Sequence, residues 1–228
     1  MQAFSCDYCK SEAFRKKESF THHLGIQDTK SSVIQCKSCK LVSLFPLPTE
    51  TELEFIYNKY ADKKGRVVIE QNWAESVYPL RLKKLRSFSQ GDRLLDIGAG
   101  LGTFVSMAIE CGFDAIGIEY EKDQCKKAQE LFGVHLFNDK IENVYQDFRD
   151  LDVVNMHHVL EHVHSPRKIF DIVHEVLKPG GIVCFEVPNQ FSNIIGSLTR
   201  APINSSKKPL QILATTYIFL RRKHLSAM

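Results

Sequence analysis

Short apolar runs separated by helix-type patterns fill the second half of the chain. The runs are RLLDIG (93–98), DAIGIE (114–119), VHLF (134–137), LDVVNMHHV (151–159) and GIVCFEVP (181–188). Short runs rich in Val, Ile and Leu are typical of strands that are buried on both faces. Because helical patterns lie between most of them, the order β-α-β repeats along the chain. This order predicts an α/β fold with a doubly wound, mostly parallel sheet covered by helices on both faces.

The segment SPRKIFDIVHEVLKPGG, residues 165–181, predicts the clearest helix. Ser165 stands at the N-cap, Pro166 at the first helical position, and Pro179 with two glycines ends the helix. Its apolar stripe consists of Ile169, Ile172, Val173, Val176 and Leu177. Closer to the N-terminus, Thr49 is a candidate cap for a helix, and a second helical pattern covers about 71–88.

Two C-x-x-C pairs mark the N-terminal segment, Cys6 with Cys9 and Cys36 with Cys39, and 26 residues separate the pairs. Each pair can form a turn that presents two thiolates to one ion, and two such turns complete a tetrahedral zinc site. The alternative is four unligated thiols, and His22 and His23 in the gap are possible substitute ligands. We expect a closed, structural zinc ribbon whose intervening chain forms a hairpin or loop.

Composition is that of an ordinary soluble globular protein, with 43% hydrophobic and 25% charged residues among 228. The net charge of +3 does not favour a nucleic-acid partner. No acidic residue follows Glu186, and the segment after it is basic. The N-terminus lacks a signal-peptide pattern, and the apolar run at 210–220 is too short for a membrane span. We therefore expect a cytoplasmic protein whose remaining cysteines, Cys111, Cys125 and Cys184, are core thiols.

A glycine-rich motif, LLDIGAGLGTF at 94–104, stands where the first strand of the sheet meets the first helix. Gly98 and Gly100 allow a tight turn under a ligand, and Gly102 allows close packing of helix and strand. A dinucleotide fingerprint would place its third glycine at position 103, which is Thr103, so a dinucleotide oxidoreductase is disfavoured. Glu119 ends the second strand, where a carboxylate can accept both hydroxyls of a ribose.

The glycine motif, the Glu119 strand end, MHHVLEHVHSP and LKPGGIVCFEVPN together resemble a class I S-adenosylmethionine-dependent methyltransferase, from about residue 75 to 190. The cysteine leader with LVSLFPLPTETELEFIYNKYAD is similar to a branch of that family with a zinc-binding leader. The resemblance implies a Rossmann-like sheet that binds S-adenosylmethionine. It further implies that Asp96 and the backbone of Gly98, Gly100 and Gly102 hold the methionine end and that Glu119 holds the ribose. Near the adenine, it implies that Asp139 or Asn138 reaches the amino group and that Ile141 covers one face.

Histidines gather at the end of the fourth strand, in NMHHVLEHVH at 155–164, where the methyl acceptor should lie. His157, His158 and His162 are candidates for acceptor contact, for a general base or for metal binding, with Glu161 beside them. His158, Glu161 and His162 also resemble the Glu-x-x-Glu-His metal stretch of ubiquinone-pathway O-methyltransferases, with histidine in place of the first glutamate. The alternative is a helix start with structural hydrogen bonds.

Four segments are expected: a zinc-ribbon leader at 1–48, a helical connector at 49–90, the cofactor-binding domain at 91–190 and a basic tail at 191–228. The family fold continues with a helix and two strands, which the tail does not match. Its LQILATTYIFL run can supply one strand or a helix. We therefore expect a truncated or replaced C-terminus and an open sheet edge that invites self-association.

The resemblance implies methyl transfer from S-adenosylmethionine to a small-molecule or nucleotide-sugar acceptor. The alternative function is a non-catalytic remnant that binds the cofactor and acts through its zinc ribbon and basic tail on protein or RNA.

Overall fold

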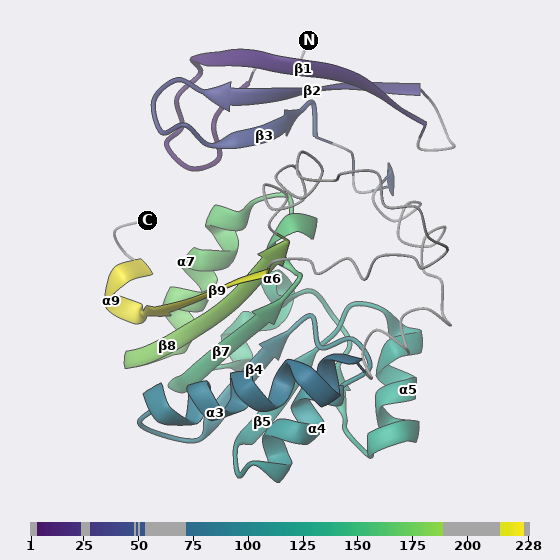
Figure 1. Cartoon of the computed structure of the whole chain (residues 1–228), viewed down its shortest axis with the longest axis vertical. Helices are drawn as coiled ribbons and strands as arrows, with labels where there is room; N and C mark the ends of the chain where they lie inside the picture. Colours follow the sequence, from purple (N-terminus) through teal and green to yellow (C-terminus); the bar gives the residue numbers. More distant parts are fainter. Residues whose placement is uncertain are drawn as a thin grey trace, which may run out of the picture. The chain divides into compact units, whose positions relative to one another are not determined.

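The computed structural model describes residues 4–23, 28–47, 49, 51–52, 72–188 and 215–225. The chain divides into two compact units. One holds residues 1–71 with 164–167, and the other holds residues 72–163 and 168–227. Figure 1 shows the elements of each unit.

The first unit contains a three-stranded antiparallel sheet in the order β1-β2-β3. Its strands are β1 (Phe14–His23), β2 (Asp28–Cys36) and β3 (Val42–Phe45). Phe4 packs edge-on against Phe14 and Phe45, with ring centroids 4.9 and 5.7 Å apart. The hairpin expected between the two cysteine pairs is therefore formed by β1 and β2.

The helix start predicted at Thr49 is present. The backbone N–H and hydroxyl of Thr49 donate to the Glu52 carboxylate at 2.7 and 2.9 Å, and the backbone N–H of Glu52 donates back to Thr49 Oγ1 at 3.3 Å. This reciprocal pair is a capping box, which satisfies backbone donors at a helix N-terminus. The apolar face predicted for this helix lies outside the described residues.

The second unit is built on a six-stranded sheet in the order β6-β5-β4-β7-β8-β9. Its strands are β4 (Arg93–Ile97), β5 (Asp114–Ile118), β6 (Leu136–Phe137), β7 (Leu151–His157), β8 (Leu177–Pro188) and β9 (Thr215–Arg221). All five apolar runs predicted as strands form β4 to β8, and their pairings are parallel. The predicted doubly wound, mostly parallel sheet is confirmed.

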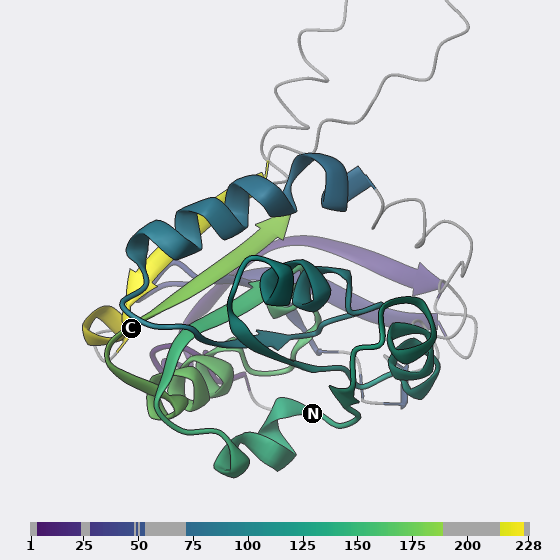
Figure 2. The same cartoon turned by 90° about the horizontal axis from the view of Figure 1, so that it is seen from below.

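Helices cover both faces of this sheet (Figure 2). They are α3 (Tyr78–Phe88), α4 (Thr103–Glu110), α5 (Lys122–Phe132), α6 (Ile141–Val144), α7 (Pro166–Val176) and α9 (Arg222–Leu225). α3 and α4 lie on one face, where Leu82 and Phe104 join a buried cluster with Leu94 and Val153 of the sheet. α7 lies on the other face and begins at Pro166 as predicted, with Ile169 and Val173 buried.

The edge of β8 was expected to stay open, and the structure corrects this. β9 pairs with β8 in antiparallel register from Ile182↔Arg221 to Pro188↔Thr215. The sequence of β9, TTYIFLR, is rich in the β-branched and aromatic residues that suit a strand. The apolar run near the C-terminus therefore supplies one strand, and β9 becomes the outer strand of the sheet.

Among the residues that the structure describes, no helix combines the length and apolar character needed to cross a membrane.

Candidate functional site

The loop after β4 contains three glycines with positive φ, and two of them also leave no room for a side chain. Gly98, Gly100 and Gly102 all have positive φ, at 74°, 56° and 76°, a region that residues with side chains rarely adopt. A Cβ at Gly98 would also lie 2.5 Å from Val159 Cγ2, and a Cβ at Gly102 would lie 2.9 Å from the Ala128 Cβ. The loop is thus a tight backbone cradle at the carboxyl ends of the central strands, where doubly wound sheets bind ligands.

Glu119 joins this loop to the next one along the sheet. Its carboxylate accepts the backbone N–H of Gly100 at 2.9 Å through Oε2 and that of Glu121 at 2.8 Å through Oε1. Both bonds hold the carboxylate against the backbone at the ends of the two loops. The structure therefore brings Glu119 and the glycine loop together, as the sequence predicts.

The candidate adenine residues lie beside Glu119. Asn138 Nδ2 donates to the backbone oxygens of Glu119 and Tyr120 at 3.0 and 2.8 Å. Asp139 accepts the Asn143 side-chain amide and the Lys140 backbone N–H, each at 2.7 Å, and these bonds hold its pKa below the usual value.

The third adenine candidate, Ile141, starts α6 and is buried. Both polar candidates, Asn138 and Asp139, therefore help to fix the loop itself.

A chain of buried polar groups runs beneath the loop, and sequence reasoning missed most of it. Asn155 of β7 donates to Asp96 of β4 at 2.7 Å, and Arg81 of α3 donates to Asn155 at 3.3 Å. Arg81 also forms an ion pair with Glu186 of β8, and all four side chains are buried. Buried charges need such partners, because an unpaired one is strongly destabilising. Asn155 and Glu186 were detectable only as single polar residues in apolar strands.

His157 is held at the end of β7, where it pairs in register with Glu186 of β8. Its Nε2 lies 3.4 Å from Glu186 Oε2, and its Nδ1 lies 3.5 Å from the hydroxyl of Tyr78. The ring of Trp73 packs edge-on against it with centroids 4.3 Å apart. Burial lowers the pKa of His157, so the neutral imidazole is favoured near pH 7.

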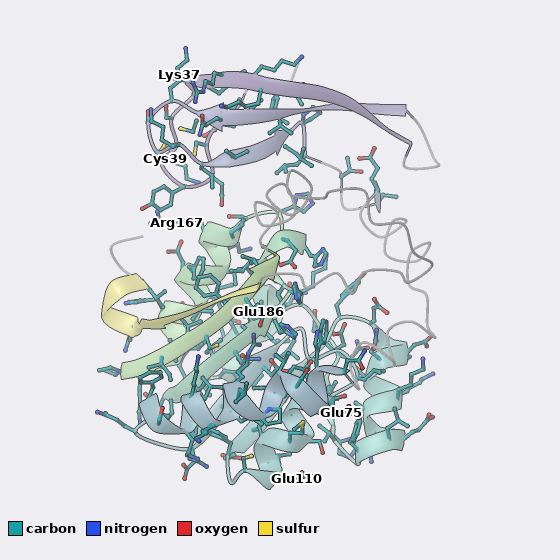
Figure 3. The ribbon with its side chains drawn as sticks, in the orientation of Figure 1. Lys37, Cys39, Glu75, Glu110, Arg167 and Glu186 are labelled. Atoms are coloured by element: carbon teal, nitrogen blue, oxygen red, sulfur yellow. The ribbon has the colours of Figure 1, made fainter. Side chains whose placement is uncertain are left out.

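His158 follows with a left-handed backbone, φ 55°, and its ring reaches the same carboxylate from another direction. His158 Nδ1 lies 2.9 Å from Glu161 Oε1, and Nε2 lies 3.9 Å from Glu186 Oε1. His162 has a side chain that is 51% exposed, with Nε2 4.0 Å from Glu161. The structure thus brings His157 and His158 together with Glu186 and leaves His162 largely in solvent (Figure 3 labels Glu186).

The four N-terminal cysteines converge at one end of the ribbon, where Figure 3 shows Cys39 among neighbouring sulfur atoms. Cys6 and Cys39 Sγ are 3.5 Å apart, as are Cys9 and Cys36 Sγ. Zn–S bonds of about 2.3 Å in a tetrahedron place sulfurs about 3.8 Å apart, so the donor set fits zinc.

The two cysteine turns have the same backbone geometry. The backbone oxygen of Cys6 accepts the backbone N–H of Lys10, and that of Cys36 accepts the backbone N–H of Lys40. Both lysines have positive φ. A backbone N–H from Cys39 is the largest cause that lowers the pKa of Cys36 to about 6, whereas burial and the neighbouring cysteine side chains raise the pKa of Cys39 to about 12. Within this pair the thiolate is therefore favoured at Cys36.

A doubly wound sheet, a glycine cradle after its first strand and an acidic residue after its second define a class I S-adenosylmethionine-dependent methyltransferase domain. Residues 69–227 match the family model described as "Methyltransferase domain", and the chain belongs to this family.

Curated relatives of this chain are also named as methyltransferases. A ubiquinone biosynthesis O-methyltransferase of Nitrosococcus oceani is 26% identical over 151 residues, which cover 61% of each chain. An uncharacterized methyltransferase of Schizosaccharomyces pombe is 34% identical over 119 residues, 44% of this chain and 41% of that one. The chain thus spans about two fifths to three fifths of the length of these curated relatives.

Among solved structures, the plantazolicin methyltransferase BpumL in complex with SAH superimposes with a TM-score of 0.50. The identity is 16%, and the match covers 64% of this chain and 62% of that one. This likeness supports the shared fold.

Proposed function

We propose that this chain binds S-adenosylmethionine in the cradle formed by the loop of Gly98–Gly102 and Glu119. The observation that carries the proposal is the bond from Gly100 N–H to the Glu119 carboxylate, which joins the two expected halves of a cofactor site. The glycines at 98 and 102 support it, because a Cβ at either position would collide with Val159 or Ala128 and disturb the loop. Asp96 fixes the start of the loop through its bond to Asn155.

We propose further that the methyl acceptor is a small molecule and that it binds against the histidines at the end of β7. When bound, S-adenosylmethionine supplies a methyl group already activated by its sulfonium. The protein therefore has to align the acceptor, exclude water and deal with the acceptor proton. His157 and His158 stand next to the glycine loop through Val159, which touches the Gly98 position. Relatives named as ubiquinone biosynthesis O-methyltransferases favour an oxygen atom as the acceptor.

Calorimetry tests the cofactor assignment directly. S-adenosylmethionine should bind one equivalent per chain, whereas NAD should give no saturable heat. A panel of catechols, phenols and nucleotide sugars, scored by formation of S-adenosylhomocysteine, then tests the acceptor class. Binding without turnover on any acceptor would favour a non-catalytic remnant, and binding of NAD alone would overturn the proposal.

We also propose a structural role for zinc at the four cysteines, with no open coordination position. The converging sulfurs and the paired left-handed turns support it. We propose that the domains have the boundaries expected from the sequence, with the ribbon at 1–48 and the connector at 49–90 ahead of the cofactor-binding domain.

A further inference from the structure

The Nε2 atom of His157 is a buried polar atom that lacks a hydrogen-bond partner among the described residues. The side chain is only 7% exposed, and the nearest carboxylate oxygen, Glu186 Oε2, is 3.4 Å away. Buried polar atoms in native proteins are nearly always satisfied, and leaving one unsatisfied costs about 1–3 kcal/mol. The position of this nitrogen therefore calls for a partner that the described residues do not provide.

His158 presents its own Nε2 to the same carboxylate, and its ring centroid lies 4.5 Å from that of His157. Both imidazoles share one pattern, in which Nδ1 faces an oxygen of a neighbouring side chain and Nε2 faces Glu186. For His157 the neighbour is the Tyr78 hydroxyl, and for His158 it is Glu161. The ligand atoms of His157, His158 and Glu186 all lie within 4.8 Å of one another.

The distances suit a shared ion better than pairwise hydrogen bonds. Hydrogen bonds from N–H to oxygen span about 2.7–3.2 Å, whereas the two Nε2–carboxylate distances are 3.4 and 3.9 Å. Metal bonds of about 2.0–2.2 Å in a tetrahedron place neighbouring ligand atoms about 3.3–3.6 Å apart. The 3.4 Å separation, from His157 to Glu186 Oε2, fits that value, whereas the 3.9 Å separation runs from His158 to the other oxygen, Oε1. An ion bound to one of these oxygens therefore requires a small side-chain movement. A carboxylate on the far nitrogen of a ligand histidine, here Glu161, is the usual outer partner of such sites.

The charges of the side chains around His157 and His158 also favour a bound cation. The chain of contacts joins three carboxylates, those of Asp96, Glu161 and Glu186, to one guanidinium, that of Arg81. With both imidazoles neutral, these groups sum to a net charge of −2, which a divalent cation would neutralise. Arg81 contacts Glu186 through Oε2, so the other carboxylate oxygen, Oε1, faces His158.

We propose that His157, His158 and Glu186 bind a divalent transition-metal ion such as zinc through two imidazole nitrogens and one carboxylate oxygen. The set differs from the stretch His158, Glu161 and His162 considered from sequence, because Glu161 moves to the outer shell and His162 is not a ligand. Two nitrogens and one oxygen leave at least one coordination position open, as in catalytic metal sites.

The role of this ion in the reaction rests on the proposed function. An acceptor hydroxyl bound at the open position would have a lowered pKa and release its proton to water. The oxygen lone pair then forms the bond to the methyl carbon while the carbon–sulfur bond breaks and its electron pair stays on sulfur. The step balances with one proton released, and it requires no oxidant or reductant.

Trp73 provides an optical test, because it is the single tryptophan of the chain. Its ring centroid lies 4.3 Å from that of His157 and 5.6 Å from that of His158, so Co²⁺ bound there should quench its fluorescence. The full chain, loaded beforehand with one equivalent of zinc at the cysteines, is titrated with Co²⁺. We expect saturable quenching at one further equivalent. The sulfur-to-cobalt charge-transfer band should be absent, which confirms that Co²⁺ has not replaced zinc at the cysteines.

Variants assign the ligands. His158→Gln and Glu186→Gln should each weaken Co²⁺ binding more than about 100-fold, and the outer-shell change Glu161→Gln about 10–100-fold. His162→Gln is the matched control and should leave the Co²⁺ affinity unchanged. Because Glu186→Gln also alters the partner of Arg81, circular dichroism checks its fold, and His158→Gln carries the test if it unfolds.

Quenching that survives in folded His158→Gln would overturn the proposal, as would quenching that His162→Gln abolishes. Absence of saturable quenching in the parent protein would overturn it as well. Calorimetry with S-adenosylmethionine on the same preparation keeps the two proposals apart. Cofactor binding without Co²⁺ quenching defeats only the metal site, and the reverse result defeats only the cofactor site.

Discussion

The Glu119 carboxylate has two tasks, because it holds the glycine loop in place and faces the expected position of the ribose. Replacing it with alanine should therefore weaken S-adenosylmethionine binding by about 1–3 kcal/mol, the range for a lost hydrogen bond to a charged group. Glu119→Gln retains one acceptor oxygen for Gly100 N–H and should lose less. Calorimetric titration measures both, with exposed Glu130→Ala as the control. Equal affinity in Glu119→Ala and the parent would contradict the assignment.

Gly98 and Gly133 both have positive φ, but only at Gly98 would an added Cβ also collide with a neighbouring side chain. Comparing alanine substitutions at the two positions therefore separates the free-energy cost of backbone strain from that of the steric clash. Gly133, with φ 66°, has no atom within 4 Å of an added Cβ, so Gly133→Ala should lose only about 1–2 kcal/mol of unfolding free energy. Gly98→Ala should lose more, because its Cβ would also meet Val159 Cγ2 at 2.5 Å.

Urea unfolding of both variants measures this difference. Adding Val159→Ala to Gly98→Ala should recover the clash part in a double-mutant cycle. Equal losses at Gly98 and Gly133 would show that Val159 moves aside at no cost.

At the scale of elements, α3 is attached to the sheet by a charged group as well as by its apolar face. Arg81 lies in the helix stripe that buries Leu82 and Leu85, and it reaches Asn155 of β7 and Glu186 of β8. Arg81→Met should cost about 3–5 kcal/mol of unfolding free energy, because the Glu186 carboxylate loses its guanidinium in a buried site.

Lys83→Met, on the exposed side of the same helix, should change the unfolding free energy by less than about 0.5 kcal/mol. Chemical denaturation of the two variants checks this contrast, and similar stabilities would mean that the ion pair contributes little.

The strands and helices show which parts of the fold and of the candidate site could be predicted from the sequence alone. Strands β4 to β8 and helix α7 were predictable, because short apolar runs and a capped 3.6-residue period are local signals. Glu119 and the glycines were predictable from their place at strand ends. Arg81 was not, since its partner Glu186 lies 105 positions away and only the packing of α3 across β7 and β8 joins them. The pairing of β9 was missed for a related reason, because a seven-residue strand within a basic, turn-rich segment has no local register signal.

On the scale of the whole molecule, the two units have separate sources of stability. The ribbon has few buried apolar residues among those described, so we expect its stability to depend on the proposed zinc, whereas the second unit has an extended core. Cys36→Ser should therefore release the zinc and loosen the β1–β2 hairpin, while S-adenosylmethionine affinity stays within about twofold. Metal analysis and calorimetry on one preparation check both outcomes. A parent protein purified without chelator that carries no zinc would contradict the structural site.

Strand order also fixes when the parts of the site can assemble during synthesis. The glycine loop and Glu119 lie on β4, β5 and the loops after them, which leave the ribosome early. Glu186 lies on β8. Its antiparallel neighbour on β9, Tyr217, follows it by 31 residues in the sequence and is therefore synthesised later. A nascent chain can thus form the cofactor cradle while the strand that carries Glu186 still lacks its outer partner. The proposed acceptor side of the site is therefore completed after the cofactor cradle.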